Sequence, residues 1–421
     1  MVRPREERLT GTLPEDLERS AILVEDRPVA EVAPAKEPLG PGEWVRQNLF
    51  SSWFNGALTV VAAVAGGWLL FQITRWFFFR AEWAVVKANL RVYMVGGFPL
   101  DQIWRVWTSL YLVVALAGLS VGVVAPRVRT LRGILVRVAL AAVGALLLMY
   151  LLDGVGIWVL IGVAVAVFAA GVAAGRLLGR RLRVPLVVGW TLAFPAVVLI
   201  IRAFGGVPPS RWAGFMLNLI VAVVAIFVSF PVGVLLALGR RSTLRAVRVF
   251  CVGFIELIRG VPLVTLLIFS ILVLPLLLPP GITVPRIMLA MTMFVVFSSA
   301  YVGEIVRGGL QGIPDGQYEA GRALGLPTWR MMGLVILPQA LRHTIPAMIG
   351  HFISLFKDTT LLAALTGFSE LLATARRATA VQFIGAEQEA LLSAALIFWG
   401  IAYAMARWSQ RVERRLGVGE R

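Results

Sequence analysis

The segment DGQYEAGRALGLPTWRMMGLVILPQALRHTIP, residues 315–346, is charged and punctuated by glycine and proline in an otherwise apolar part of the chain. Gly325 is typical of the left-handed residue that ends a helix, and Pro327 fits the first turn of a second helix that Pro338 closes. These signals predict two short helices that form a compact knob, with Ala320, Gly321 and Ala323 exposed on the first helix. The alternative is an amphipathic helix that rests on lipid headgroups.

The composition around this segment is that of a membrane protein. Of the 421 residues, 59% are hydrophobic, and the mean hydropathy is +0.84. Repeated apolar runs long enough to cross about 30 Å of hydrocarbon predict an all-α polytopic fold with about ten transmembrane helices. The expected spans lie near residues 55–74, 107–125, 138–152, 155–174, 185–204, 213–238, 262–280, 287–306, 345–366 and 391–408. Pro262, which follows Gly260, is expected to kink the start of the seventh span.

The distribution of charge predicts the orientation and excludes several classes of protein. The connections after the second, fourth and sixth spans hold four arginines each, which is the positive-inside pattern of cytoplasmic loops. We therefore expect both termini and the knob in the cytoplasm of a multi-pass inner (plasma) membrane protein. The net charge of +17 lies in these short loops, so nucleic-acid binding is not expected. A single cysteine, Cys251, excludes an internal disulfide, and with only two histidines we expect no metal site.

Composition also divides the chain. Residues 1–48, which are rich in charge and proline, predict a disordered cytoplasmic tail. Residues 49–204 form five spans with almost no polar groups, and we interpret them as accessory helices. Residues 205–421 form five more spans, carry nearly all the polar chemistry, and include a cytoplasmic loop at 308–344.

Catalytic motifs are weak or absent. No lysine follows a glycine, so the phosphate-binding loop of an ATPase is missing. The sequence GLSVG at 118–122 matches a nucleophile elbow, which leaves open an intramembrane serine hydrolase with Ser120 as nucleophile and His343 or His351 as base. Small residues at this spacing more often allow close helix packing, which we favour. An ion-coupled secondary transporter is a third class, but the inverted repeats it predicts are not visible.

The knob carries a family resemblance. Seven residues resemble the EAA loop of importer permeases of the ATP-binding cassette (ABC) class: Glu319, Ala320, Gly321, Gly325, Val335, Leu337 and Pro338. The resemblance implies that this loop is the coupling helix that docks onto an ATPase subunit. Gly321 stands where the family has a second alanine, a change that costs up to about 1 kcal/mol of helix propensity.

The flanking sequences narrow the resemblance. FIELIRGVPLVTLL, AYVGEIVRGGLQGIPDGQYEAG and FKDTTLLAAL resemble the polar amino-acid permease family over residues 211–408, and the added spans resemble the larger M-type subunit of the general L-amino-acid system. The resemblance implies a type I importer core formed by the last five helices, without catalytic activity or a cofactor of its own. It implies as partners a second permease subunit, two ATPase subunits that bind ATP, and a periplasmic or lipid-anchored binding protein for L-amino acids.

Two charged motifs mark the core helices. Glu256 and Arg259, and likewise Glu304 and Arg307, are three residues apart, which places each pair on one helix face. We interpret them as pairs across helices or subunits that help to hold an inner gate shut. The alternative is that they are interfacial ion pairs worth under about 1 kcal/mol each.

A second charged group, Lys357-Asp358-Thr359-Thr360, interrupts an apolar run. Charges inside a membrane are costly unless they are paired, hydrated or bound to a ligand, so this group predicts a substrate path. Asp358 would accept the ammonium of an amino acid, and Thr359 and Thr360 would bind its carboxylate. The alternative is an internal pair of Lys357 with Asp358 at the outer boundary. His343 and His351 are interpreted as ordinary interfacial and packing residues.

Overall fold

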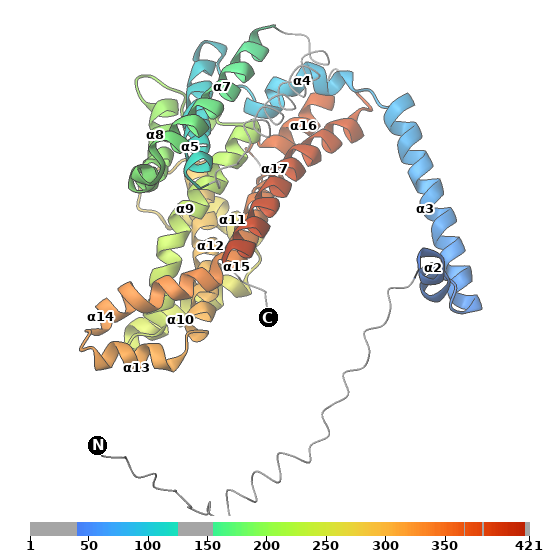
Figure 1. Ribbon diagram of the computed structural model, residues 1–421. Coiled ribbons are helices and arrows are strands. Elements are labelled where there is room, and N and C mark those ends of the chain that lie inside the picture. Colours follow the sequence, from blue (N-terminus) through green and yellow to red (C-terminus); the bar gives the residue numbers. More distant parts are fainter. Residues whose placement is uncertain (1–39, 125–154, 366, 381–382, 417–421) are drawn as a thin grey trace, which may run out of the picture. The chain divides into compact units, whose positions relative to one another are not determined.

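The computed structural model describes residues 40–124, 155–365, 367–380 and 383–416, which form two units, Met1–Arg80 and Ala81–Arg421. Within these residues the regular elements are helices, which confirms the all-α prediction (Figure 1). Seven of the helices are long and apolar enough to cross a membrane, and an eighth crossing results if a bent helix pair counts as one span. The span predicted at residues 138–152 lies outside the described part of the chain.

The first unit consists of α2 (Pro41–Leu49) and α3 (Trp53–Phe79). The predicted tail at residues 1–48 therefore ends in a helix, because Pro41 suits a helical first turn. Ser52 caps α3 by accepting a hydrogen bond from the Asn55 backbone N–H at 3.2 Å. The best 18-residue window of α3 is apolar and 0% buried, as expected for a helix that faces lipid.

The second unit begins with α4 (Ala84–Val95), α5 (Ile103–Val124), α7 (Val155–Leu178) and α8 (Arg183–Arg202). Helices α5 and α7 run parallel and very close, because the glycines of GLSVG face those of GVAAG: Gly118 with Gly171 and Gly122 with Gly175. A side chain at any of the four would collide with the facing backbone. The packing interpretation of GLSVG is confirmed.

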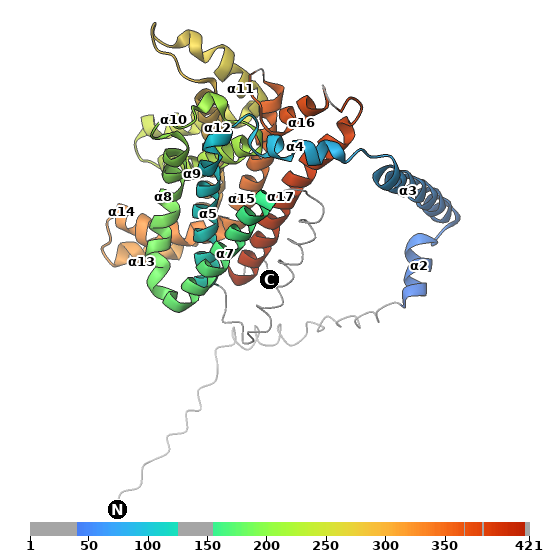
Figure 2. The same cartoon turned by 90° about the horizontal axis from the view of Figure 1, so that it is seen from above.

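Five helices form the core of this unit (Figures 1 and 2). They are α9 (Gly214–Arg240), α11 (Leu263–Leu272), α12 (Arg286–Gln311), α15 (Leu337–Asp358) and α17 (Glu387–Leu416). Helices α9 and α12 begin at one end, beside α16 (Leu371–Thr379), and finish at the other, beside α13 (Asp315–Ala323). We call these the α16 end and the α13 end.

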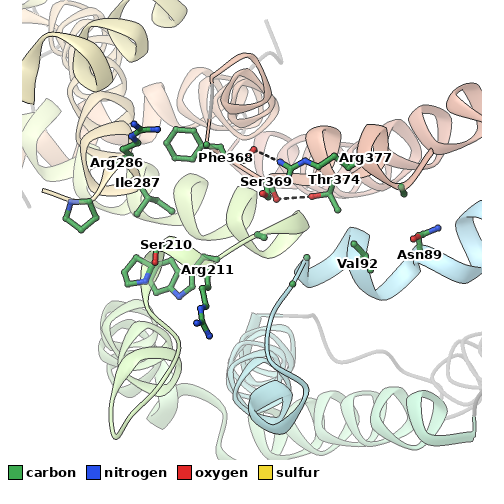
Figure 3. A pocket seen from close by; sticks show the side chains of 18 residues that line it. Asn89, Val92, Ser210, Arg211, Arg286, Ile287, Phe368, Ser369, Thr374 and Arg377 are labelled. Carbon is green, nitrogen blue, oxygen red and sulfur yellow. Dashed lines mark hydrogen bonds between the residues drawn. The ribbon is translucent and has the colours of Figure 1, made fainter. Parts of the chain in front are cut away.

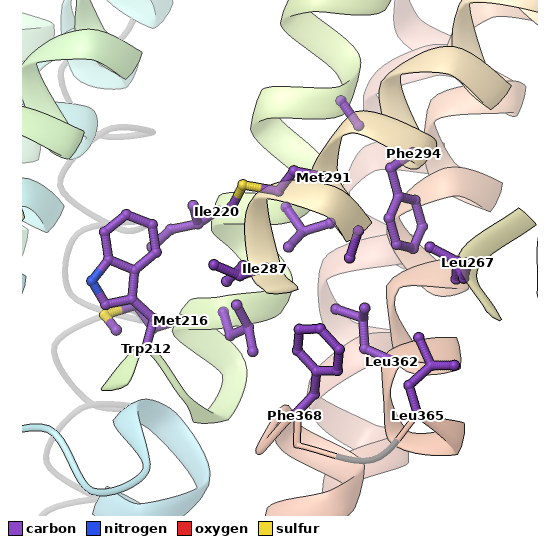
Figure 4. Packing of buried hydrophobic residues seen from close by; sticks show 14 of the residues in the cluster. Trp212, Met216, Ile220, Leu267, Ile287, Met291, Phe294, Leu362, Leu365 and Phe368 are labelled. Carbon is purple, nitrogen blue, oxygen red and sulfur yellow. The ribbon is translucent and has the colours of Figure 1, made fainter. Parts of the chain in front are cut away.

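Large side chains fill the space between the core helices toward the α16 end (Figure 4). Leu217 of α9, Phe294 of α12 and Leu362 of the 3₁₀ helix η6 (Thr359–Ala364) are each fully buried there. Further along, Gly233 allows α9 to approach Val302 of α12 so closely that a Cβ atom would not fit. In a bilayer such contacts stabilise the fold chiefly through close packing, because the lipid is as apolar as the side chains.

Two predicted spans have different boundaries in the structure. The run at 262–280 contains the short helix α11 and the 3₁₀ helix η4 (Leu274–Leu277), and α10 (Arg245–Gly260) meets α11 at an angle of 101°. Pro262 precedes α11 directly, which confirms the expected kink at this proline. The run at 345–366 belongs to a helix that begins earlier, at Leu337, and ends at Asp358.

Candidate functional site

The knob consists of α13 and α14 (Thr328–Met331) joined by a turn at Gly325. Gly325 has a φ of +68°, the left-handed conformation that glycine adopts at little cost. Its N–H donates to the Arg322 carbonyl at 2.9 Å, and the Leu326 N–H donates to the Gly321 carbonyl at 3.1 Å. This pair of bonds is the Schellman motif, so the predicted helix stop is confirmed.

The end of the knob differs from the prediction, because Pro338 does not close the second helix. After α14 the chain forms one π-helical turn, η5 (Met332–Ile336), and continues without a break into α15. Pro338 is tolerated since it directly follows the π turn, where the Leu337 N–H donates to the Met332 carbonyl five residues back and the regular α-helical hydrogen-bond pattern is already interrupted. The knob and the core helix α15 are therefore one continuous helical segment.

Gly321 explains the one departure from the EAA pattern. It is buried, and a Cβ atom there would lie 2.7 Å from the sulfur of Met331. We expected Gly321 to lie on the exposed side of its helix, and this was wrong, because α13 packs against α14 at this position. Ala320 and Glu319 are exposed as expected.

Large apolar side chains are exposed on the knob and just after it, beyond the ends of α9 and α12, among charged residues such as Arg322 and Arg330. Leu324, Trp329 and Leu334 are 78%, 70% and 72% exposed. Arg241, next to the end of α9, holds the knob in place by donating to the Tyr318 hydroxyl at 2.7 Å. Exposed apolar side chains held on a fixed support are characteristic of a protein-docking surface.

The charged side chains of the two E-x-x-R motifs meet where α9, α10 and α12 converge, near the α13 end. Glu304 is the centre: it accepts two hydrogen bonds from Arg307, at 2.6 and 2.8 Å, and lies 3.3 Å from Arg240 and 3.8 Å from Arg259. Glu256 pairs with Arg240 at 3.1 Å. The motifs thus make contacts across three helices.

Sequence reasoning did not identify Arg240 as part of this cluster. It lies in a four-arginine connection that indicated only orientation. As the last residue of α9, it bridges Glu256 of α10 and Glu304 of α12. The spacing within each motif predicted that its glutamate and arginine share one face of a helix. It did not predict that a third helix, α9, would supply the arginine that bridges the two motifs.

The Lys357–Thr360 group lies at the junction of α15 and η6, toward the α16 end. Lys357 is exposed and Asp358 is half-buried, but Thr359 is fully buried. The Thr359 hydroxyl donates to the Phe356 carbonyl at 2.6 Å and accepts from the Asn218 amide at 3.1 Å. Thr359 is therefore not open to a solute, contrary to its predicted role.

Asn218 belongs to a buried polar network that sequence reasoning missed. Its amide also donates to Glu370 at 3.1 Å, and its carbonyl oxygen accepts from the Leu371 N–H at 3.1 Å. Glu370 caps α16 by accepting from the Ala373 N–H at 2.7 Å. Burial raises the pKa of Glu370, although these hydrogen bonds act in the opposite direction. The only sequence signal was one amide within the apolar run at 213–238.

Residues 229–418 match the family of inner membrane components of binding-protein-dependent transport systems. The chain is 34% identical over 402 residues to the inner membrane amino-acid ABC transporter permease protein YhdY of Escherichia coli, with 89% of this chain and 93% of that protein covered. The chain belongs to this permease family. A glutamate/glutamine/aspartate/asparagine transport system permease protein of Rhodobacter capsulatus, BztC, is 34% identical over 434 residues, with 91% and 96% covered.

Shorter proteins resemble about half of the permease. The probable glutamine ABC transporter permease protein GlnP of Bacillus subtilis is 32% identical over 205 residues, which are 48% of this chain and 92% of that protein. A crystal structure of an amino acid ABC transporter has 28% sequence identity and a TM-score of 0.44, with 48% of this chain and 92% of that chain covered. Membership in this family makes the permease a multi-pass inner membrane protein.

One face of α15 in the permease is exposed but not apolar. At spacings of three and four residues it presents His343, Ala347, Gly350, Ser354 and Lys357, and this set is called the polar stripe below. The stripe extends over about 21 Å at 1.5 Å per residue. Exposed positions on α9 are instead large and apolar, as suits lipid: Leu219, Val223, Phe227 and Leu235. The spacing of the stripe residues is visible in the sequence, but the apolar residues that lie between them made it hard to recognise.

The hydrolase alternative has no supporting geometry. The Ser120 hydroxyl donates to the Leu116 carbonyl at 2.8 Å and accepts from the Trp190 indole at 2.9 Å. The ring of His351 instead lies 3.0 Å from the Ser298 hydroxyl and stacks on Tyr301. Family membership supports a permease over both the hydrolase and the ion-coupled transporter.

Proposed function

We propose that this permease imports L-amino acids as the non-catalytic transmembrane subunit of an ATP-driven complex. The complex would contain a second permease subunit, two ATPase subunits that bind ATP, and a periplasmic or lipid-anchored amino-acid-binding protein. The names of the relatives, which are amino-acid ABC transporter permeases, support the substrate class. The observation that carries the proposal is the knob, whose exposed apolar side chains offer an ATPase subunit a place to dock.

We propose that the α13 end faces the cytoplasm, with both termini on that side. Arginines are concentrated at this end, on the connection after α9 and on α10, α12, α13 and α14. ATP-driven closure of the ATPases would move the knob, and α15, which continues from it, would move the core helices. The solute path would then open alternately to each side.

The solute path would follow the polar stripe. A lipid-facing helix has no reason to expose a histidine, a serine and a lysine on one face, whereas a water-filled path favours them. The path would end at the Glu304 cluster, which we propose as part of the inner gate. Tyr301 lies between the two regions, since it stacks on His351, the neighbour of Gly350 in α15, and lies 5.6 Å below the Arg259 guanidinium.

Replacement of Glu319 by alanine tests the docking role. In liposomes that contain the full complex, Glu319→Ala should lower ATP-driven amino-acid uptake at least tenfold and weaken co-purification of the ATPase subunits. Glu387→Ala, an exposed glutamate at the α16 end, is the matched control and should leave both unchanged. Unchanged uptake and co-purification in Glu319→Ala would refute the docking role, and uptake without ATP by this chain alone would refute the function.

A further inference from the structure

A pocket of about 860 Å³ opens at the α16 end, far from the knob (Figure 3). Its walls come from α4, the segment before α9, the start of α12, the loop before α16, and α16 itself. This volume lies in the range of small-molecule sites, roughly 300–1,000 Å³. An amino acid would fit together with several water molecules.

The pocket is positively charged. Arg211, Arg286 and Arg377 line it, and no lining residue is a carboxylate. Figure 3 shows the three arginines on separate elements around the pocket. Arg377 donates to the Phe368 carbonyl at 3.0 Å, but among the described residues none of the three has an ion pair. Their charge is therefore available to an anion.

Two long helices add to this charge. Helices α9 and α12 both begin at the pocket wall, after Ala213 and Pro285, and neither has a side-chain cap, although the Gly214 N–H of α9 donates to the Ser369 carbonyl at 2.6 Å. The first N–H groups of a helix carry a partial positive charge that favours an anion. The backbone at this end is also unusually close to its neighbours. Gly367, with a φ of +95°, lies where a Cβ atom would be 3.1 Å from the Arg286 guanidinium.

Helix α4 completes the pocket, although it lies outside residues 229–418, the part that matches the family. It contributes Asn89 and Val92, and Gly96 at its end packs against Ala213 so closely that no side chain would fit there. Helix α4, which precedes the residues that match the family, thus forms one wall of a pocket whose other walls include the start of the core helix α12.

We propose that this pocket binds the carboxylate of a free amino acid before the solute enters the path, and that α4 is present to complete the site. The inference rests on the proposed function only for the class of solute. A guanidinium is well suited to a carboxylate, because its planar N–H groups match the two oxygens. The distribution of three arginines around the pocket allows the carboxylate to pass from one to another on its way inward.

The test measures binding of radiolabelled L-glutamine to the purified complete transporter without added binding protein. Arg286→Gln and Arg377→Gln should each raise the half-saturating concentration about tenfold, since each removes a charge-assisted hydrogen bond. Arg377→Lys should restore part of the affinity. Arg376→Gln is the matched control, an exposed arginine that is adjacent on α16 but does not line the pocket. L-Glutamine amide, which lacks the α-carboxylate, should compete poorly.

The proposal is overturned if the glutamine variants bind like the wild type, or if the amide competes as well as the acid. It is also overturned if, in a parallel measurement with the binding protein added, the variants weaken only the docking of that protein, because the charges would then serve acidic residues of that partner. ATP-driven uptake by the wild-type complex is measured in parallel. The absence of uptake would refute the proposed function. Normal uptake, together with amino-acid binding by the arginine variants that equals that of the wild type, would refute only the role proposed for the pocket.

Discussion

At the scale of single residues, Glu304 has the most charged contacts of any residue in the described part of the chain. Three arginines share its carboxylate, and its side chain is only 21% exposed. Glu256 has one such partner and is 57% exposed. Since an ion pair that is exposed to solvent is worth little, the two glutamates should differ in their contribution to stability.

We predict that Glu304→Gln lowers the free energy of unfolding by about 1–3 kcal/mol, because it leaves half-buried guanidinium groups without their acceptor. Glu256→Gln should cost under about 1 kcal/mol. Thermal denaturation of the detergent-solubilised protein compares the two variants. Equal losses of stability would show that Glu304 is not the centre of the cluster.

Glu370 predicts a dependence of stability on pH. Burial raises its pKa above the ordinary value of 4.5, so the folded protein binds this proton more readily than the unfolded chain does. The contribution of Glu370 to stability should therefore increase as the pH falls from above the raised pKa to 4.5, and become constant below that.

The melting temperature, measured between pH 4 and pH 8, checks this expectation against Glu370→Gln, which cannot titrate. The difference between wild type and variant should grow in favour of the wild type as the pH falls. Glu387→Gln, an exposed glutamate in the first turn of α17, is the control and should follow the wild-type profile. A difference independent of pH would contradict the raised pKa.

At the scale of the element, the knob contains two glycines with opposite requirements, one inside α13 and one in the turn that follows it. Gly316 is helical with open space around it, so Gly316→Ala should stabilise α13 by up to about 1 kcal/mol. Gly325 is left-handed, so Gly325→Ala should destabilise the turn by about 1–2 kcal/mol. Hydrogen exchange of residues 315–331 measures both effects. A loss of protection in Gly316→Ala, or none in Gly325→Ala, would contradict this account.

The helix boundaries show what local sequence predicts well. Gly325 and Pro262 act through their own backbone geometry, so the stop of α13 and the bend before α11 were predictable. Pro338 was misjudged because the π turn before it accommodates a proline inside a continuous helical segment, and that turn had no sequence signal. Gly321 was misjudged because its burial depends on Met331, a residue of the next helix.

At the scale of the whole molecule, the polar stripe predicts a pattern of chemical labelling. Cys251 is the only cysteine and is buried, so a single introduced cysteine reports on its own surroundings. In the full complex, Ser354→Cys should react with a charged, membrane-impermeant thiol reagent roughly tenfold or more faster than Val223→Cys, because lipid disfavours the reactive thiolate. An excess of amino acid should slow the reaction of Ser354→Cys.

Val223 is the matched control, since it is 45% exposed on an apolar face of α9. Equal reaction rates at the two positions would place the stripe against lipid. An unreactive Ser354→Cys would show that the stripe is packed against another protein subunit, and either result would refute the solute path proposed for α15.

Much of the architecture followed from the sequence, because membrane spans, arginine-rich connections and the EAA pattern are local signals. The site was harder to predict because its parts combine distant residues. The buried network joins Asn218 to Glu370, and the pocket at the α16 end combines α4 with the starts of α9 and α12. Such contacts depend on how the helices pack, which the spacing along one helix does not indicate.

The unbroken helical segment at residues 328–358 has a consequence for how the two ends of the permease are related. Successive residues of an α-helix differ by about 100° in direction, and the π turn at Met332–Ile336 holds one residue more than an α-turn. The length of this turn therefore sets the angle, measured around the helix axis, between the polar stripe and the outer surface of the knob. Removal of one residue, such as the exposed Gly333, would turn the two faces about 100° out of phase while each stayed intact.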